Sequence, residues 1–346
     1  MSVVVSRALS ALLMMAGAAI PAAAQICEPA PSGLVGWWPG NGNASDVIAG
    51  NNGQLAGDVA FAPGTVGLGF KLDGEGDYVQ IPDSSALKPQ RVSVEVWVRF
   101  DSLTTPNSTP GVINATQYIV FKKNTRTFNF EAYALRKQRD NAGIDRFAFS
   151  IGDVTGVGTL AIATSTTQVV VGQFYHVVGT YDGSFVRLYV NGALEGQAAT
   201  SVAINYDTRP VFLGTSGETF FDGKLNGIID EASIYNRALD VFEIARLHAA
   251  GAAGKCSSVT GALVSLATFI QTLNLSRGIS NSLDAKLQNA LDALDAANAG
   301  DVISACNRLS AFINEVNAQS GNALTENQAA QLATAGTQVR SALGCR

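Results

Sequence analysis

The sequence predicts two folded parts, an all-β sandwich of two antiparallel sheets followed by an all-α four-helix bundle. Between Gly33 and about Ala250, short runs of branched and aromatic residues alternate with Gly, Asn, Asp and Pro, which is typical of strands and turns. No long helical pattern interrupts these runs, so two antiparallel sheets packed face to face are expected. After residue 254 the spacing of apolar residues changes from two to about 3.6, the period of a helix.

The N-terminal segment 1–24 has the pattern of a secretory signal peptide. Arg7 supplies the positive start, residues 8–20 are apolar or small, and residues 22–24 are alanines that offer a cleavage site before Gln25. The apolar stretch is shorter than the ~20 residues needed to span a bilayer, and no later segment reaches that length. We therefore expect a secreted or periplasmic protein whose mature chain has no membrane span.

The charge balance excludes one broad class of function. Arg7 is the only charged residue of the expected signal, so the mature chain would carry 22 basic and 28 acidic residues, a formal charge of −6. This balance excludes a strongly basic nucleic-acid binder. The length fits roughly two domains. We expect the sandwich over residues 25–250, a small-residue linker over 251–257 and the bundle over 258–346.

The strands of the sandwich are expected where alternation and turn residues coincide. Val92–Phe100 alternates most regularly, with its valines on one face and Ser93, Glu95 and Trp97 on the other. Asp182-Gly183 predicts a two-residue hairpin turn, and a short helix over residues 240–249 is expected to cap the sandwich. The other expected strands are Gly33–Trp38, Phe70–Leu72, Tyr78–Ile81, Gln117–Lys123, Thr127–Leu135, Arg146–Ile151, Phe174–Tyr181, Ser184–Val190 and Val211–Gly214.

The segment Gly223–Leu239 is the expected closing strand. On a period of two, one face carries Ile228, Asp230, Ala232 and Ile234, and the other carries Ile229, Glu231, Ser233 and Tyr235. This alternation turns the Asp230 carboxylate toward a largely apolar face. Burying a charge is costly unless a cation or hydrogen-bond donors receive it, so we expect such a partner at Asp230.

The C-terminal part is expected to contain four helices. Val259–Leu273 is helical in pattern, and Leu283–Ala297 places leucines and alanines on one stripe. Asp301 can cap a third helix, and Thr325 with Gln328 predicts a capping box for a fourth. Short connections favour an up-and-down bundle.

Four cysteines follow the expected signal, and four cysteines allow three disulfide pairings. In an up-and-down bundle the fourth helix returns antiparallel to the third, which brings Cys345 near Cys306. A sandwich that closes its last strand beside its first brings Cys256 toward Cys27. We therefore expect the pairs Cys27–Cys256 and Cys306–Cys345.

Seven motifs occur in order between residues 33 and 250. They are GLVGWW at 33–38, Asp46 with GNNG at 50–53, FKLDGEGDYV at 70–79, VSVEVW at 92–97, YHVVGTYDG at 175–183, VNG at 190–192 and GIIDEASIYNRAL at 227–239. Together they resemble the concanavalin A-like, laminin G-like jelly-roll family, which implies a jelly-roll sandwich. The tail, with AFINEV at 311–316, QSG at 319–321 and LT at 324–325, looks like the FIMAH-type four-helix module of secreted bacterial proteins.

The resemblance to laminin G-like domains implies a structural calcium between the loop after the first strand and the closing strand. Its ligands here would be Asp46 with Asn43 or Asn52, backbone carbonyls, and Asp230. Such hard oxygen ligands suit Ca²⁺. The alternative is that Asp46 stabilises a turn and Asp230 accepts backbone N–H groups.

Carbohydrate binding is the function expected for the sandwich. Sugars stack on exposed aromatic rings, and the candidate rings are Trp38, Tyr181, Tyr206 and Phe220, which lie in or beside loops. The alternative is that such rings pack in the core, which is the commoner use of Trp. The basic hairpin with Lys122, Lys123, Arg126 and Arg136–Arg139 is interpreted as a solvated face.

Catalysis is not expected. Glucanases of this fold place two carboxylates on one strand in a Glu-x-Asp-x-x-Glu pattern, which does not occur here. The adjacent Asp230 and Glu231 would point to opposite faces. The expected function is therefore non-catalytic recognition of a glycan or an extracellular protein. The alternatives are a structural spacer in a surface protein and, third, a divergent glycoside hydrolase.

Overall fold

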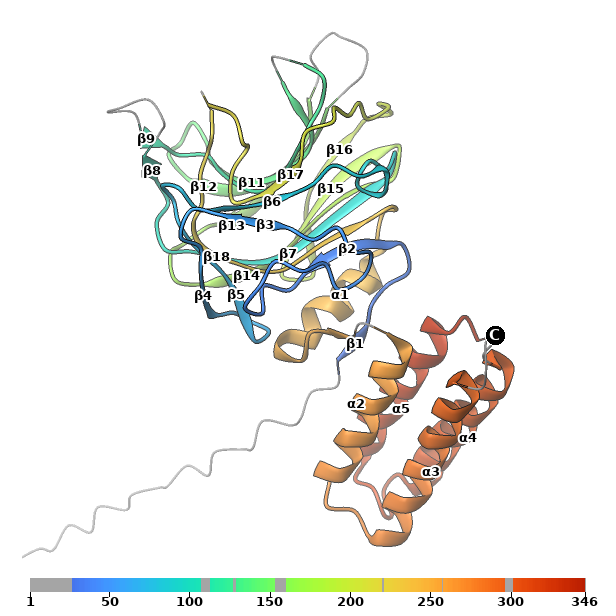
Figure 1. Ribbon diagram of the computed structural model, residues 1–346. Helices are drawn as coiled ribbons and strands as arrows, with labels where there is room; N and C mark the ends of the chain where they lie inside the picture. The colour runs from blue at the N-terminus through green and yellow to red at the C-terminus, as the bar shows by residue number, and fades with distance from the viewer. Residues whose placement is uncertain are drawn as a thin grey trace, which may run out of the picture.

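The computed structural model describes residues 27–106, 113–126, 129–152, 160–219, 221–256, 258–295 and 301–345. Figure 1 shows a two-sheet sandwich built from the first part of the chain and a separate bundle of helices built from the last part. An antiparallel sandwich followed by a helical bundle is therefore confirmed. The expected signal peptide and its cleavage site lie outside the described residues.

One layer of the sandwich is a seven-stranded antiparallel sheet, in the order β13-β12-β11-β10-β17-β6-β3. Its strands are β13 (Leu160–Gln168), β12 (Asp145–Gly152), β11 (Glu131–Arg139), β10 (Gln117–Lys123), β17 (Val211–Leu213), β6 (Tyr78–Ile81) and β3 (Gln54–Ala56). Strand β11 begins later than the expected Thr127–Leu135, because its partner residues in β10 and β12 set the paired length.

The other layer is an eight-stranded sheet in the order β16-β15-β14-β7-β18-β5-β4, with β2 paired to β18. Its strands are β16 (Ala193–Ala199), β15 (Phe185–Val190), β14 (Phe174–Tyr181), β7 (Val92–Phe100), β18 (Asn226–Tyr235), β5 (Leu68–Asp73), β4 (Ala60–Pro63) and β2 (Leu34–Trp38). The smaller elements are β1 (Glu28–Pro29) paired with β19 (Lys255–Cys256), β8 (Thr105–Pro106) paired with β9 (Ile113–Asn114), and the 3₁₀ turns η1 (Ser85–Leu87) and η2 (Gly251–Ala253).

The core lies between the two sheets and follows the alternation of β7. Val92, Val94, Val96 and Val98 are fully buried in the main apolar cluster. On the outer side of β7, Ser93, Glu95 and Trp97 are also buried, because helix α1 (Val241–Ala250) and the β1–β19 pair cover this side of the sheet.

The closing strand β18 contains a β-bulge that changes its faces. Asp230 pairs with Trp97, but Ser233 pairs with Glu95, so β18 has one extra residue at this point. Glu231 takes up the extra length with φ +59°, a left-handed conformation that is uncommon for such a residue. The expected alternation is therefore wrong beyond residue 230. Ile229 and Ala232 both face the core, and Asp230 lies on the outer side.

The edge strands β13 and β16 meet along one side of the sandwich. A Cβ atom on Gly196 of β16 would lie 2.3 Å from the carbonyl oxygen of Thr164 in β13, so only glycine permits this approach. The Glu195 carboxylate accepts hydrogen bonds from the backbone N–H groups of Thr166 (3.0 Å) and Thr167 (2.8 Å). These amides of an edge strand are thus occupied by a side chain of the other sheet.

The C-terminal bundle consists of α2 (Val259–Thr272), α3 (Arg277–Asp295), α4 (Val302–Gln319) and α5 (Glu326–Ala342). Asp301 caps α4, and Thr325 and Gln328 form the expected capping box of α5. Leucine, phenylalanine and alanine side chains from all four helices form one buried cluster. Helix α3 starts earlier than expected from its leucine stripe, at Arg277.

Both expected disulfides are present, Cys27–Cys256 and Cys306–Cys345. They join the two ends of the sandwich part and the last two helices, as the topology predicts. Among the described residues, no helix is both long and apolar enough to cross a bilayer.

Candidate functional site

The outer face of the seven-stranded sheet is the sandwich face that α1 and the bundle leave uncovered (Figure 1). We call this surface the open face. Strand register places side chains from neighbouring strands in a row across it: Gln80, Phe212, Phe121, Ala134 and Ser150. Phe121, Ala134 and Ser150 are fully buried and Phe212 nearly so, so this row forms a packed layer beneath the surface.

An aromatic cluster occupies the centre of the open face. It contains Tyr118, Phe121, Phe130 and Phe212, with Tyr78 packed beside them, and it is separate from the main core. The ring of Phe221 packs edge-on against Tyr118 at 6.3 Å and keeps 40% of its surface exposed. The open face therefore presents an accessible aromatic ring on a buried aromatic floor.

A track of polar side chains runs beside this cluster from β10 to β12. The Tyr118 hydroxyl donates to Glu131 (3.4 Å), the Arg136 guanidinium lies 3.7 Å from the same carboxylate, and it donates to Ser150 (2.7 Å). Burial and the nearby Glu131 charge raise the pKa of Tyr118, so its hydroxyl stays neutral and can donate. A few hydrogen-bonding groups among aromatic side chains are the usual lining of a small-molecule site.

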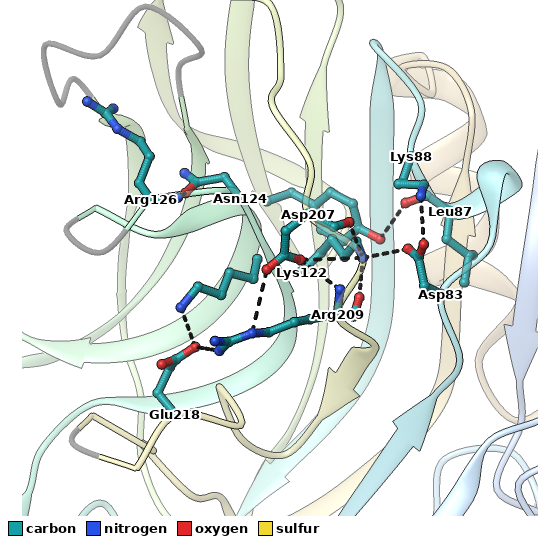
Figure 2. A network of polar contacts seen from close by, with 11 residues as sticks. Asp83, Leu87, Lys88, Lys122, Asn124, Arg126, Asp207, Arg209 and Glu218 are labelled. Atoms are coloured by element: carbon teal, nitrogen blue, oxygen red, sulfur yellow. Dashed lines mark hydrogen bonds and ion pairs between the residues drawn. The ribbon is translucent and has the colours of Figure 1, made fainter.

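Figure 2 shows the network of ion pairs at one margin of the open face. Lys123 contacts Glu218 (2.5 Å), which also pairs with Arg209, and the fully buried Lys122 contacts Asp83 (2.8 Å). The interpretation of the basic hairpin as a solvated face is thus wrong for its lysines. Their ammonium groups fold inward because carboxylates from neighbouring loops receive them.

The candidate sugar-stacking rings do not lie on the open face. Trp38 and Tyr181 are buried in the main core, where Trp38 donates to the Asn51 carbonyl (2.9 Å) and Tyr181 donates to the Val202 carbonyl (2.5 Å). Tyr206 is half-buried, donates to the Pro89 carbonyl and packs edge-on against Tyr133. Core packing, the alternative reading, accounts for these three rings. Phe220 lies outside the described residues.

The candidate calcium ligands in the first loop are already hydrogen-bonded. The Asp46 carboxylate accepts five hydrogen bonds, from the backbone of Trp37, Ile48, Ala49 and Asn51 and from the Asn51 amide. Asn52 accepts from the Asp46 N–H, and Asn43 accepts from the Ser45 N–H. Both Asp46 oxygens are therefore occupied by N–H donors, an environment that suits a loop-stabilising carboxylate better than a metal ligand.

Asp230 is fully buried on the outer side of β18. Its Oδ2 atom accepts from the N–H groups of Thr65 (2.7 Å) and Val66 (2.9 Å), while its Oδ1 atom has no partner. Burial raises the pKa of Asp230 to about 7, despite those two donors, and the neighbouring Glu231 charge adds to this. The expected receiving group is thus a pair of backbone amides. Because of the bulge, Glu231 also lies on the outer side, beside Lys255, so the expectation of opposite faces is wrong.

A different acidic group could hold a metal ion. Carboxylate oxygens of Asp58, Asp73 and Asp77 lie within 4.8 Å of one another, and neither Asp46 nor Asp230 belongs to this group. Burial and the charge of Asp73 raise the pKa of Asp77, so a cation would relieve repulsion here. The placement of calcium on Asn43, Asp46, Asn52 and Asp230 stays a prediction.

Sequence reasoning missed the open face because irregular strands hide its pattern. Strand β10 contains a register shift between Tyr118 and Val120, so Tyr118 and Phe121 share a face although they are three residues apart. A period of two would separate them. The high density of aromatic residues in and after β10 is the sequence feature that could have indicated an aromatic cluster on this face.

The family comparison covers the central half of the chain. Residues 73–245, half of the 346 residues, match the model of the concanavalin A-like lectin/glucanases superfamily. The chain belongs to this superfamily. This confirms the jelly-roll part of the resemblance and leaves the helical tail outside the matched region. The comparison with curated proteins found no match.

Several solved structures are similar to this concanavalin A-like chain. Domain 4 of AbnA, an extracellular GH43 arabinanase from Geobacillus stearothermophilus, solved with arabinotriose, is 19% identical over 62% of this chain and 97% of its own, with a TM-score of 0.47. The receptor binding domain of botulinum neurotoxin C/D mosaic serotype is 16% identical over 63% and 51%, with a TM-score of 0.46. The alignment with the binding domain of Paraclostridial Mosquitocidal Protein 1 (15%, TM-score 0.43) covers 57% of this chain and 47% of that one, so this chain spans about half the length of both toxin domains.

Proposed function

We propose that this protein is an exported, non-catalytic binding module that recognises a glycan through the open face. One observation carries the proposal: the exposed ring of Phe221 packs on the aromatic cluster of the sandwich face that no described helix covers. Superfamily membership supports it, because this superfamily includes lectins. The expected secretion rests on the signal-like N-terminus and on the two disulfides, which form and persist in oxidising compartments.

The contacts of the open face suit a neutral sugar. The exposed ring of Phe221 offers a stacking surface for the apolar face of a sugar ring. Beneath it, the buried Arg136 guanidinium donates to Ser150 and Gln138 and holds these polar groups in place. Cationic and acidic side chains are paired along the face, so its chemistry favours hydroxyl groups over a highly charged polymer.

The same pairing supports a non-catalytic role. Glu131 lies beside Arg136, Glu218 beside Lys123 and Arg209, and Asp222 beside Lys224 (3.3 Å). A glycosidase needs two carboxyl groups that face one glycosidic bond from either side. On the open face, each of these three carboxylates is directed to a cation instead.

The test is binding on a glycan array, followed by titration of any sugar that binds. Replacing Phe221 with Ala removes the exposed ring and should weaken binding about two- to tenfold, since one stacking contact is worth about 0.5–1.5 kcal/mol beyond the area that it buries. Phe242→Ala is the matched control, because Phe242 is 71% exposed on α1, on the other side of the sandwich. Equal loss in both variants, or binding unaffected by Phe221→Ala, would contradict the proposal. A spacer would bind no glycan in either form.

We also propose a structural calcium at Asp58, Asp73 and Asp77, as the alternative to the predicted set around Asp46, and we propose that the bundle is a FIMAH-type module. The three clustered carboxylates have the oxygen chemistry that Ca²⁺ prefers. Asp73 and Asp77 also accept backbone N–H groups, but three carboxylates meet here, whereas neither Asp46 nor Asp230 belongs to such a group. A rise in melting temperature on adding Ca²⁺, abolished in Asp77→Asn and retained in Asp46→Asn, would support this placement.

A further inference from the structure

The segment that connects the two parts of the chain contains β19, which pairs in parallel with β1 from the start of the sandwich part to form a two-strand ribbon. Successive side chains along a strand point to opposite faces. In this ribbon Cys27 and Cys256 face the bundle, whereas Glu28 and Lys255 face the sandwich. The predicted linker 251–257 therefore contains a strand, β19, with one face toward the sandwich and the other toward the bundle.

On the bundle side, the ribbon is part of the helical core. Cys256 belongs to the buried cluster of the bundle, and its disulfide partner Cys27 packs against that cluster. The Cys27 N–H also donates to the Ser265 hydroxyl of α2 (3.4 Å). The ribbon is thus joined to the bundle by packing, by a covalent bond between its own strands and by a hydrogen bond.

On the sandwich side, the ribbon is held by ion pairs, and those of Lys255 are buried. The Lys255 ammonium contacts Glu95 of β7 (3.1 Å) and Glu231 of β18 (3.3 Å), and it lies 5.1 Å from the centre of the Trp37 ring. Its side chain is 3% exposed. At the other strand of the ribbon, Glu28 pairs with Arg246 of α1 (3.0 Å). Both strands of the ribbon are therefore fastened to the sandwich.

The carboxylate that receives Lys255 is itself held in place. Glu95 also accepts from the Tyr235 hydroxyl (2.7 Å) and contacts His176 Nε2 (3.2 Å). Burial alone would raise the pKa of Glu95, but the charge of Lys255 and the hydrogen bonds with His176 and Tyr235 lower it to about 2. Glu95 is therefore ionised at every physiological pH, and a buried anion without its cation is strongly unfavourable. Withdrawing Lys255 would leave this anion and the buried Glu231 carboxyl group without their cation.

We propose that the β1–β19 ribbon is a rigid coupling that fixes the bundle on the side of the sandwich opposite the open face. Lys255 binds the sandwich and the next residue, Cys256, packs in the bundle. The two parts therefore cannot rotate about the chain between them. Figure 1 shows the resulting arrangement, with the bundle beyond α1 and the seven-stranded sheet on the far side. This inference does not depend on which ligand the open face binds.

Small-angle X-ray scattering and elastase digestion test the coupling in the full chain. Wild type should scatter as a single arrangement and resist cleavage in the alanine-rich segment 250–253. Lys255→Met should scatter as a range of arrangements and be cleaved there at least tenfold faster. Lys286→Met is the matched control, because it breaks a half-exposed lysine pair with Glu315 inside the bundle, and it should behave as wild type.

Two outcomes would overturn the coupling. One is a wild-type scattering curve that requires several arrangements. The other is a Lys255→Met protein whose scattering and digestion match wild type. Tryptophan fluorescence reports whether the sandwich is folded in each variant, since all three tryptophans lie in it. If Lys255→Met alone unfolds the sandwich, the double variant Lys255→Met/Glu231→Gln leaves one buried carboxylate instead of two, and the same two readouts decide.

Discussion

The buried Asp230 carboxyl should make the stability of the sandwich depend on pH in an unusual direction. Its ordinary pKa is 3.8, and burial raises the pKa in the folded protein to about 7. Between these two pH values, the folded state binds one proton more than the unfolded state. Stability therefore falls as pH rises through this range. The full effect is on the order of 4 kcal/mol, at about 1.36 kcal/mol per pKa unit.

The perturbation that isolates this effect is Asp230→Asn. The amide oxygen can still accept from the Thr65 and Val66 N–H groups, but the side chain no longer titrates. At pH 4 the variant should be less stable than wild type by about 1–3 kcal/mol, because its buried NH₂ group lacks an acceptor. Its stability relative to wild type should nevertheless improve by about 3–4 kcal/mol between pH 4 and pH 8.

Urea unfolding followed by tryptophan fluorescence at several pH values measures this difference. Trp37, Trp38 and Trp97 all belong to the sandwich, so the signal omits the bundle. Glu75→Gln, which removes one exposed acidic charge from the turn after β5, is the control and should stay nearly parallel to wild type. If the Asp230→Asn and wild-type curves also run parallel within about 1 kcal/mol, burial does not control this carboxyl and the reasoning fails.

Three further perturbations test other parts of the structure. Replacing Cys27 and Cys256 with Ser removes a disulfide that spans 229 residues and should lower the free energy of unfolding by up to ~5 kcal/mol in the chain-entropy model. Denaturant unfolding measures this loss. A loss smaller than that caused by removing Cys306–Cys345, which spans 39 residues, would contradict the model. Gly179→Ala places a Cβ 2.2 Å from the Phe149 ring and should lower stability by about 1–3 kcal/mol, whereas Gly172→Ser, in an exposed turn with open space around it, should lower stability less, through its positive φ alone. Phe312→Ala in the bundle core should cost about 3–5 kcal/mol and be seen by circular dichroism but not by tryptophan fluorescence.

The sequence predicted the architecture well because architecture depends on many residues at once. The valines of β7 determine the inner face of a central strand whatever happens elsewhere. The capping box of Thr325 and Gln328 is a local pattern that defines where α5 begins. The disulfides followed from topology alone, since antiparallel helices and a closed sandwich bring the cysteines together. Each of these features survives small local irregularities.

The candidate site was predicted less well because it depends on such irregularities. One left-handed residue, Glu231, reverses the faces of β18 and changes the surroundings of Asp230. One register shift in β10 places Tyr118 and Phe121 together on the open face. Trp38, predicted to stack on a sugar, is buried in the core instead. Single-residue bulges leave no clear trace in the apolar pattern, so a period of two misassigns everything that follows them.

The meeting of β13 and β16 has a consequence for self-association. Sandwich proteins can polymerise when the free backbone of an outer strand templates a strand from another molecule. Here the carboxylate of Glu195 occupies amides on one flank, and Gly196 lets the two sheets close on each other there. The opposite flank ends in β3 and β4, which have three and four residues, and β4 ends in a proline. Neither flank therefore offers a long strand with free backbone groups to which another molecule could add a strand. The folded protein should stay monodisperse at high concentration.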